Sequence, residues 1–142
     1  MKKLLFVVDP LDEFKVQKDT TFSIMREAQL RGHHIAACLP RDIQWKSGSF
    51  VAATVQQISL TGSYPGWYRV HDTKQMHLKD FDAVLMRKDP PFNAEYIYAT
   101  HLLEQVEREG GNVVNRPRSL RDHPEKLAIM EFSHLAPPTL VT

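Results

Sequence analysis

Cysteine is almost absent from this 142-residue sequence, in which Cys38 is the only one. A single thiol cannot close a disulfide within the chain, so we expect a reducing compartment, the cytoplasm. Cys38 lies within the apolar run from Ile35 to Leu39. That setting predicts a small buried residue, because a reactive thiol needs a cationic and partly exposed environment.

The sequence also lacks an excess of charge of either sign. Lys and Arg total 18 and Asp and Glu total 17, which provides no bulk field for nucleic acid or an anionic membrane. No segment approaches the length of a transmembrane helix. The apolar run Leu4–Val8 is shorter than the core of a signal peptide and stops at Asp9-Pro10. We therefore expect neither a nucleic-acid nor a membrane partner.

Several common functional motifs are missing. There is no G-x-G-x-x-G, no Walker A pattern and no G-x-S-x-G nucleophile elbow. The seven histidines form no recognised metal spacing with Cys38 or with paired carboxylates, so no metal site is predicted. Trp45, Trp67 and the adjoining Tyr68-Arg69 could be imagined as a base-stacking platform, but packing on a sheet is the favoured interpretation.

The first forty residues have the pattern of a strand–helix–strand unit. Leu4–Val8 is a continuous apolar run typical of a strand covered on both faces. Asp19–Thr21 offers good N-caps for a helix that Gly32 would end, and His34–Leu39 reads as a second strand. Such crossovers are nearly always right-handed and join parallel strands.

The stretch from Arg41 to Lys79 interrupts this alternation. Ile43–Lys46 alternates, Ser47-Gly48 marks a turn and Phe50–Leu60 supplies strand-forming residues. This pattern predicts an antiparallel hairpin insertion, with Trp67–Val70 adding an extended piece.

Regular alternation then resumes. Ala83–Met86 predicts a third core strand, Asp89–Phe92 a rigid proline loop, Asn93 the cap of a helix that ends at Gly110-Gly111, and Val113-Val114 a fourth core strand. The predicted fold class is therefore α/β: an open, mainly parallel sheet with helices on both faces and an antiparallel hairpin insertion.

The last part of the sequence predicts one more helix. Asp122–Glu125 has the spacing of a capping box, the helix should run to about Phe132, and Pro137-Pro138 should break it. Thr139–Thr142 has the composition of a strand that has only begun. We therefore expect the chain to be a piece of a longer protein.

Candidate ligand-binding residues follow from the topology, because ligands of open parallel sheets bind at the carboxyl ends of the strands. That rule selects Asp9-Pro10, Arg87–Asp89 and Asn115-Arg116. Arg87 and Lys88 could hold a carboxylate or a phosphate. The alternative is that Arg87 and Asp89 only pair with each other and stiffen the loop. Lys126, in the first turns of the last predicted helix, is either an anion ligand or a solvated surface residue.

Several long stretches resemble the bacterial glutathione synthetase family very closely. The run from Val84 to Thr100, which contains M-R-K-D-P-P-F, is compositionally unusual and carries most of the resemblance. It continues at Val113–Asn115, Ser119–Asp122, Glu125–Leu127 and Pro138–Thr142, and is weakest from about residue 41 to residue 79.

The resemblance implies a pre-ATP-grasp, Rossmann-like domain over residues 1–121 and the beginning of an ATP-grasp domain over residues 122–142. It implies a cytoplasmic, homo-oligomeric ligase of glutathione biosynthesis that joins γ-glutamylcysteine to glycine through an acyl phosphate. ATP is consumed and Mg²⁺ is required in such enzymes.

Within this family Lys126 matches the first ATP-phosphate lysine, and Asp9, Arg87 and Asp89 match positions on the substrate side. The resemblance places the catalytic residues, the second ATP lysine, the glycine-rich lid and the Mg²⁺ ligands beyond residue 142, so the chain alone is expected to be inactive. Two alternatives remain open: a stand-alone ligand-binding or oligomerisation module derived from this domain, and a nucleotide-binding regulatory domain.

Overall fold

A computed structural model describes all 142 residues, and its first three elements form the predicted crossover. Strand β1 (Lys3–Val7) is followed by helix α1 (Thr20–Leu30) and by strand β2 (His34–Cys38), which pairs with β1 in parallel. The Asp19 carboxylate accepts a hydrogen bond from the Phe22 amide, so α1 is capped as predicted.

The other parallel strands lie on the far side of β1. Strand β6 (Ala83–Met86) pairs with β1, and β7 (Val113–Val114) pairs with β6. Helix α2 (Ala94–Arg108) connects them, and the Asn93 side chain accepts from the Tyr96 amide at its start. Each of these predictions is confirmed.

Three antiparallel strands complete a seven-stranded sheet of order β3-β4-β2-β1-β6-β7, with β5 on the outer side of β4. They are β3 (Ile43–Gln44), β4 (Ala52–Leu60) and β5 (Tyr68–His77). The predicted hairpin region is confirmed, but β5 runs seven residues beyond the expected end at Val70. Because β4 also pairs with β2, this region is an integral half of the sheet.

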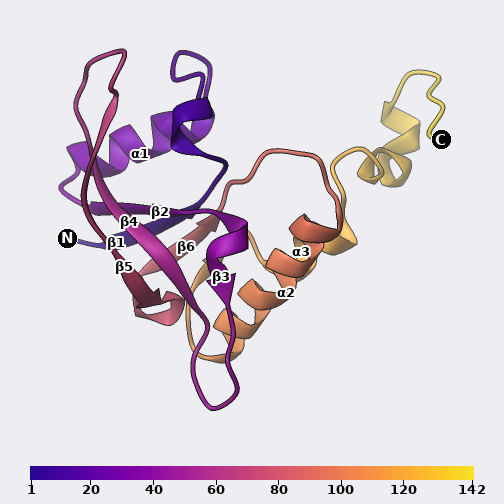
Figure 1. Ribbon diagram of the computed structural model, residues 1–142. Coiled ribbons are helices and arrows are strands. Elements are labelled where there is room, and N and C mark those ends of the chain that lie inside the picture. The colour runs from indigo at the N-terminus through magenta and orange to yellow at the C-terminus, as the bar shows by residue number, and fades with distance from the viewer.

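Helices cover both faces of the sheet, as Figure 1 shows and as the fold class predicted. Alternate residues of β1 point to opposite sides. Phe6 packs in the cluster that contains Met25 of α1, whereas Leu5 packs in the cluster that contains Leu103 of α2. All four side chains are fully buried.

The aromatic residues of the hairpin region serve mainly in packing. Trp67 is buried and stacks on Phe14 with ring centroids 5.3 Å apart, while Phe22 meets its edge at 5.3 Å. The preference for packing over base stacking is therefore confirmed at Trp67, whereas Trp45 is 51% exposed between β3 and β4. Cys38 is buried, as predicted.

The carboxyl-terminal part differs from prediction. Helix α3 (Pro117–Asp122) was not expected, and the Asp122 carboxylate accepts from Arg118 within it, so the predicted capping box is wrong. The following segment is a 3-10 helix, η4 (Ala128–Leu135), and residues 139–142 form no strand. Asp122 is the last helical residue of α3, whereas an N-cap residue has a non-helical backbone, so it cannot also cap the next helix.

Residues 123–142 form an arm that projects from the domain in Figure 1. No residue of η4 is buried, and Leu127, Met130, Phe132 and Leu135 are exposed. Short 3-10 turns also occur at η1 (Leu11–Glu13), η2 (Pro40–Asp42) and η3 (Leu78–Asp80). None of the helices combines the length and the apolar character that crossing a bilayer would require.

Candidate functional site

The ends of β1 and β6 lie side by side because the two strands are parallel neighbours. Val7 is the register partner of Met86, and the Arg87 amide donates to the Val7 carbonyl at 2.8 Å. The chain segments after both strands therefore leave the sheet at the same edge, which brings Asp9 together with Arg87–Asp89. Two of the three strand ends selected from the sequence meet in this way.

The Asp9 carboxylate clamps the loop that follows β6. Its Oδ1 accepts from Lys88 Nζ at 2.8 Å and its Oδ2 accepts from the Asp89 amide at 2.8 Å. Lys88 Nζ also donates to the Asp89 carbonyl at 3.0 Å, and the Lys88 side chain is only 12% exposed. Both oxygens of Asp9 are thus engaged within the protein, which makes this residue a support of the loop.

The Arg87 guanidinium is held by the first turn of α1. Its Nε donates to Thr21 Oγ1 at 3.1 Å and one Nη donates to Thr20 Oγ1 at 2.9 Å. Arginine has five N–H donors, so two are used and three stay available for a ligand. Arg87 forms no salt bridge, so the alternative in which it pairs with Asp89 is wrong.

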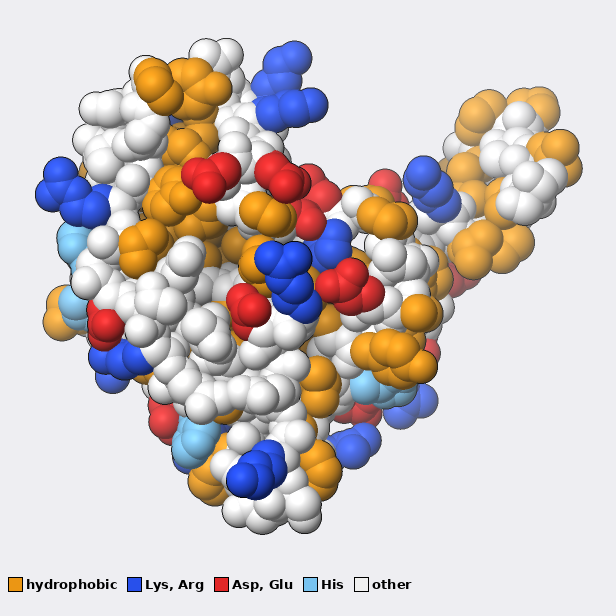
Figure 2. Space-filling model, viewed as in Figure 1, with side chains coloured by type: hydrophobic (Ala, Val, Ile, Leu, Met, Phe, Trp, Pro, Cys, Tyr) orange, Lys and Arg blue, Asp and Glu red, His pale blue; other side chains and the backbone are white.

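Two hollows flank the loop of residues 87–90. The α1-side hollow has a volume of about 390 Å³ and is lined by Asp9, Glu13, Phe14, Lys15, Lys18, Asp19, Arg87, Asp89 and Pro90. The α2-side hollow has a volume of about 320 Å³ and is lined by residues 86–90, Phe92, Tyr96, Asn115, Leu120, His123, Pro124 and Glu125. Arg87 and Asp89 border both, and Figure 2 shows acidic and basic side chains intermixed near this edge.

The remaining candidate residues make no side-chain hydrogen bond to this loop. Asn115 lines the α2-side hollow, but Arg116 lines neither hollow. Lys126 lies in a turn before η4 and not in the first turns of a helix as predicted. Its side chain is exposed, makes no hydrogen bond or salt bridge, and borders neither hollow.

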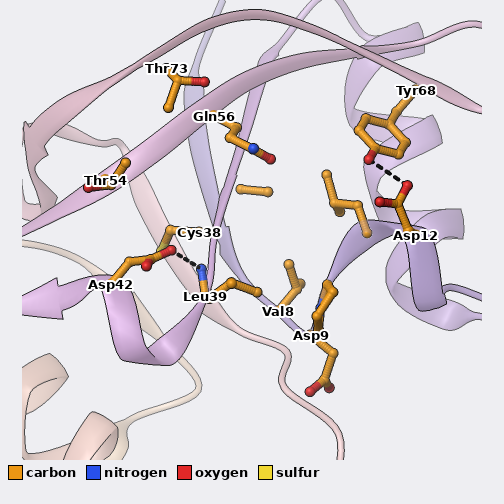
Figure 3. Close-up of a pocket in the computed structure, with 13 residues that line it drawn as sticks. Val8, Asp9, Asp12, Cys38, Leu39, Asp42, Thr54, Gln56, Tyr68 and Thr73 are labelled. Carbon is orange, nitrogen blue, oxygen red and sulfur yellow. Dashed lines mark hydrogen bonds between the residues drawn. The ribbon is translucent and has the colours of Figure 1, made fainter.

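A third cavity, of about 190 Å³, lies between the ends of β1 and β2 and the β4–β5 hairpin (Figure 3). The Tyr68 hydroxyl donates to Asp12 at 2.8 Å, and the Asp42 carboxylate accepts from the Leu39 amide at 3.2 Å. Burial, followed by the bond to Asp12, raises the pKa of Tyr68. In Figure 3 the Asp9 carboxylate points away from the cavity. All the carboxylates that line this cavity already have protein partners, so we interpret it as a packing cavity between the strands and not as a ligand site.

Sequence reasoning missed how the candidates are held. Thr20 and Thr21 were recognised only as caps of α1, although both hydroxyls bind Arg87. Lys88 was considered as an anion ligand, although its ammonium is occupied by Asp9. No local signal announces these contacts, because the partners are 66 to 79 residues apart in the chain.

An open, mainly parallel α/β sheet with charged side chains at its parallel strand ends defines a Rossmann-like domain. Comparison with known sequences identifies the family of this domain. The family described as prokaryotic glutathione synthetase, N-terminal domain, matches residues 2–121. The chain belongs to this family.

Curated relatives are similar to the chain over nearly all of its length. Glutathione synthetase from Ralstonia nicotianae is 49% identical over 140 residues, covering 99% of this chain and 43% of the relative. The Nitrosomonas europaea protein of the same name is 48% identical, with 99% and 44% covered. That of Vibrio parahaemolyticus is 44% identical, with 100% and 45% covered. The chain thus spans less than half the length of these relatives.

Proposed function

We propose that this chain supplies the amino-terminal part of a glutathione synthetase, a cytoplasmic ligase that joins γ-glutamylcysteine to glycine at the expense of ATP. The observation that carries the proposal is the family match over residues 2–121. The geometry supports it, since an arginine with free donors stands at the strand-end edge where ligands of such sheets bind. The lone buried cysteine supports a reducing compartment.

The proposed reaction has two steps. The cysteinyl carboxylate attacks the γ-phosphorus of ATP and ADP leaves, which turns a poor electrophile into an acyl phosphate. The glycine amine then attacks the acyl carbon, inorganic phosphate leaves and the amine gives up a proton. In this scheme Arg87 binds a carboxylate of the dipeptide, and Asp9 keeps the Arg87–Asp89 loop at the sheet edge.

We further propose that residues 122–142 begin a second domain, in which Lys126 binds an ATP phosphate. The family match stops at residue 121, and the arm that follows exposes a series of large apolar side chains. Exposed apolar surface of this kind is typical of a contact with another domain or protein. A homo-oligomeric assembly is part of the same proposal and rests on family resemblance.

Mg²⁺ chemistry needs ligands that these 142 residues do not bring together. No group of three or more His, Cys, Asp or Glu side chains is arranged to hold a metal ion. We propose that Mg²⁺, the second ATP lysine and the lid belong to the part of the relatives that the chain does not match. Mg²⁺ would there neutralise the phosphate charge during transfer.

The test compares the 142-residue chain with the product of its complete reading frame. We expect ADP release that depends on both γ-glutamylcysteine and glycine in the complete product, and none in the chain. Turnover by the chain alone would refute this division of labour, and an inactive complete product would refute the ligase assignment. A reading frame that stops after Thr142 would favour the stand-alone module.

Lys126 has its own test in the complete product. Lys126→Ala should weaken ATP binding about tenfold or more, because a charged hydrogen-bond partner of the phosphate is lost. Lys46→Ala is the matched control, since Lys46 is also an exposed lysine, located between β3 and β4. Equal ATP affinities of the two variants would remove Lys126 from the nucleotide site.

A further inference from the structure

Arg87 and Asp89 carry opposite charges two residues apart on the same hollow, yet they are not paired. The Asp89 carboxylate makes no hydrogen bond or salt bridge, although its amide and carbonyl are both bonded. Arg87 bonds only to two neutral hydroxyls. Both side chains therefore border the hollow with their charges unpaired by any opposite charge.

Two sets of contacts keep them separate. The Asp9 clamp fixes the backbone at Asp89 through its amide, and the Thr20 and Thr21 hydroxyls fix the guanidinium against α1. Thr21 is buried and the Lys88 side chain is 12% exposed, so each set of contacts includes one partner that is shielded from water. The Arg87 guanidinium and the Asp89 carboxylate therefore both face the α1-side hollow without forming an ion pair with each other. Preorganisation of this kind favours a ligand that brings the two complementary charges.

The chemistry of the α1-side hollow fits a small zwitterion. Its volume of about 390 Å³ lies within the range of small-molecule sites. Its free charges have both signs, because Lys15 and Lys18 make no side-chain salt bridge and neither does Glu13. A purely anionic ligand would meet the Asp89 and Glu13 carboxylates, and a purely cationic one would meet Arg87 and the lysines.

We propose that the α1-side hollow binds an α-amino-acid group, with Arg87 on its carboxylate and Asp89 on its ammonium. Asp9 is a positioning residue that acts through the loop. This inference rests on the proposed function and names the end of the substrate: the γ-glutamyl end of the dipeptide carries an α-carboxylate and an α-ammonium that the reaction leaves untouched. The cysteinyl carboxylate, which must meet ATP, is then free to point away.

The experiment is an NMR titration of the 142-residue chain with three peptides. They are γ-glutamylcysteine, its analogue without the α-ammonium (glutaryl-cysteine), and its analogue with the glutamyl α-carboxylate amidated. In the unaltered chain each analogue should bind about tenfold or more weakly than the parent, since each loses one charged hydrogen bond. The amides of residues 13–19 and 87–89 should shift on binding.

Variants then assign each charge to its partner. In Asp89→Asn, the analogue without the ammonium should bind as well as γ-glutamylcysteine, whereas the amidated analogue should still bind more weakly. Arg87→Gln should show the reverse pattern. The loss of affinity of an analogue relative to γ-glutamylcysteine is called its penalty below. Asp9→Asn should reduce both penalties together, because a released loop lets Arg87 and Asp89 pair. Arg26→Gln and Asp80→Asn remove exposed charges that line neither hollow and should change neither penalty.

Three outcomes would overturn the inference: equal affinities for all three peptides, penalties that survive in the matching variant, or no shift around the hollow at any peptide concentration. An Asp9→Asn variant that is less stable but keeps both penalties would show that Asp9 is structural only. The ligase proposal is judged separately by turnover of the complete reading frame. A complete product that is active while these penalties are absent would keep the proposed function and reject this site.

Discussion

Lys88 Nζ lies 2.8 Å from Asp9 Oδ1, and this ion pair joins the segments that leave β6 and β1. The two side chains are 12% and 29% exposed. Because the pair is partly shielded from water, breaking it from one side only is costly, since the remaining charge keeps its burial and loses its charged partner. The loop that carries Arg87 therefore depends on Asp9, a residue 79 positions before Lys88.

Asp9→Ala should lower the free energy of unfolding by about 1–3 kcal/mol, because the Lys88 ammonium loses its charged acceptor and keeps only the Asp89 carbonyl, while the Asp89 amide loses its acceptor. Urea denaturation followed by circular dichroism measures the change. Asp80→Ala is the control, since Asp80 pairs with Lys79 at 3.2 Å and is 54% exposed. That variant should cost less than about 1 kcal/mol, and an equal loss in both would deny the clamp any special role.

Docking of α3 on α2 should depend on pH through Glu104. The hydrogen bond from Arg121, aided by the charges of Arg121 and Arg108, lowers the pKa of Glu104 below its ordinary value of 4.5. Arg121 also donates to the buried Thr100 hydroxyl at 3.3 Å. A lowered folded-state pKa means that the stabilisation is complete above the unfolded value and is lost as the pH falls through the folded one.

We therefore expect the amide signals of α3 to stay unchanged down to the ordinary Glu range and to shift as the solution is acidified further, in an NMR titration. Glu104→Gln should show altered α3 signals already near neutral pH and no such acid transition. Glu107→Gln is the control, because Glu107 lies on the same helix and has no side-chain partner. An unchanged transition in Glu104→Gln would assign it to another group.

Gly111 should not tolerate a side chain. A Cβ atom there would lie 2.5 Å from Val106 Cγ1 and 3.1 Å from the Lys79 Cα. Gly111→Ala should destabilise the fold by about 1–3 kcal/mol through overpacking. The double variant with Val106→Ala should cost less than the sum of the two single changes, because it removes the clashing methyl group. Additive costs in urea denaturation would contradict this steric explanation.

Cys38 should be unreactive in the folded chain. Burial, with a smaller contribution from the nearby Asp42 charge, raises the pKa of its thiol to about 12. At pH 8 only about one thiol in ten thousand would then be ionised. Ellman's reagent should label the native chain orders of magnitude more slowly than the chain in concentrated urea. Ser47→Cys in a Cys38→Ala background is the exposed control, and equal native rates at the two positions would refute the prediction.

Local signals were sufficient for the parallel half of the sheet. The Asp19 and Asn93 caps each bond the amide three residues on, as their sequence context indicates. Strand β5 was underestimated for a physical reason. The side chains of residues 69–75 are exposed on both faces of this edge strand, and a strand with no buried face shows no apolar alternation.

The carboxyl-terminal helices show how one pattern supports two interpretations. Asp122 and Glu125 have capping-box spacing, but Asp122 is already the last residue of α3 and pairs with Arg118. Pro117 at the start of α3 was a usable signal, since proline is favoured at the first helical position. A six-residue helix buries too few side chains to produce a helical apolar periodicity, so the capping-box spacing was the stronger signal.

The location of the site could be predicted from the sequence, but its hydrogen-bond partners could not. The strand-end rule selects Asp9 and Arg87 correctly as neighbours, because it depends only on parallel pairing. Which oxygen accepts from which donor depends on side chains that the fold brings together from distant segments. Even the role of Asp9 is ambiguous in the sequence, because an aspartate that binds a ligand and one that supports a loop have the same sequence pattern.

The span of the clamp also bears on the order of folding. The Asp9 and Asp89 partners are 80 residues apart, and Arg87 is 67 residues from Thr20, whereas the β4–β5 hairpin closes over a short loop. Closing a long loop costs more chain entropy than closing a hairpin, so we expect the hairpin to form before these long-range contacts. A half-folded chain therefore has no assembled edge for a ligand to bind. Any ligand of this edge selects the completed domain and adds its binding energy to the native state alone.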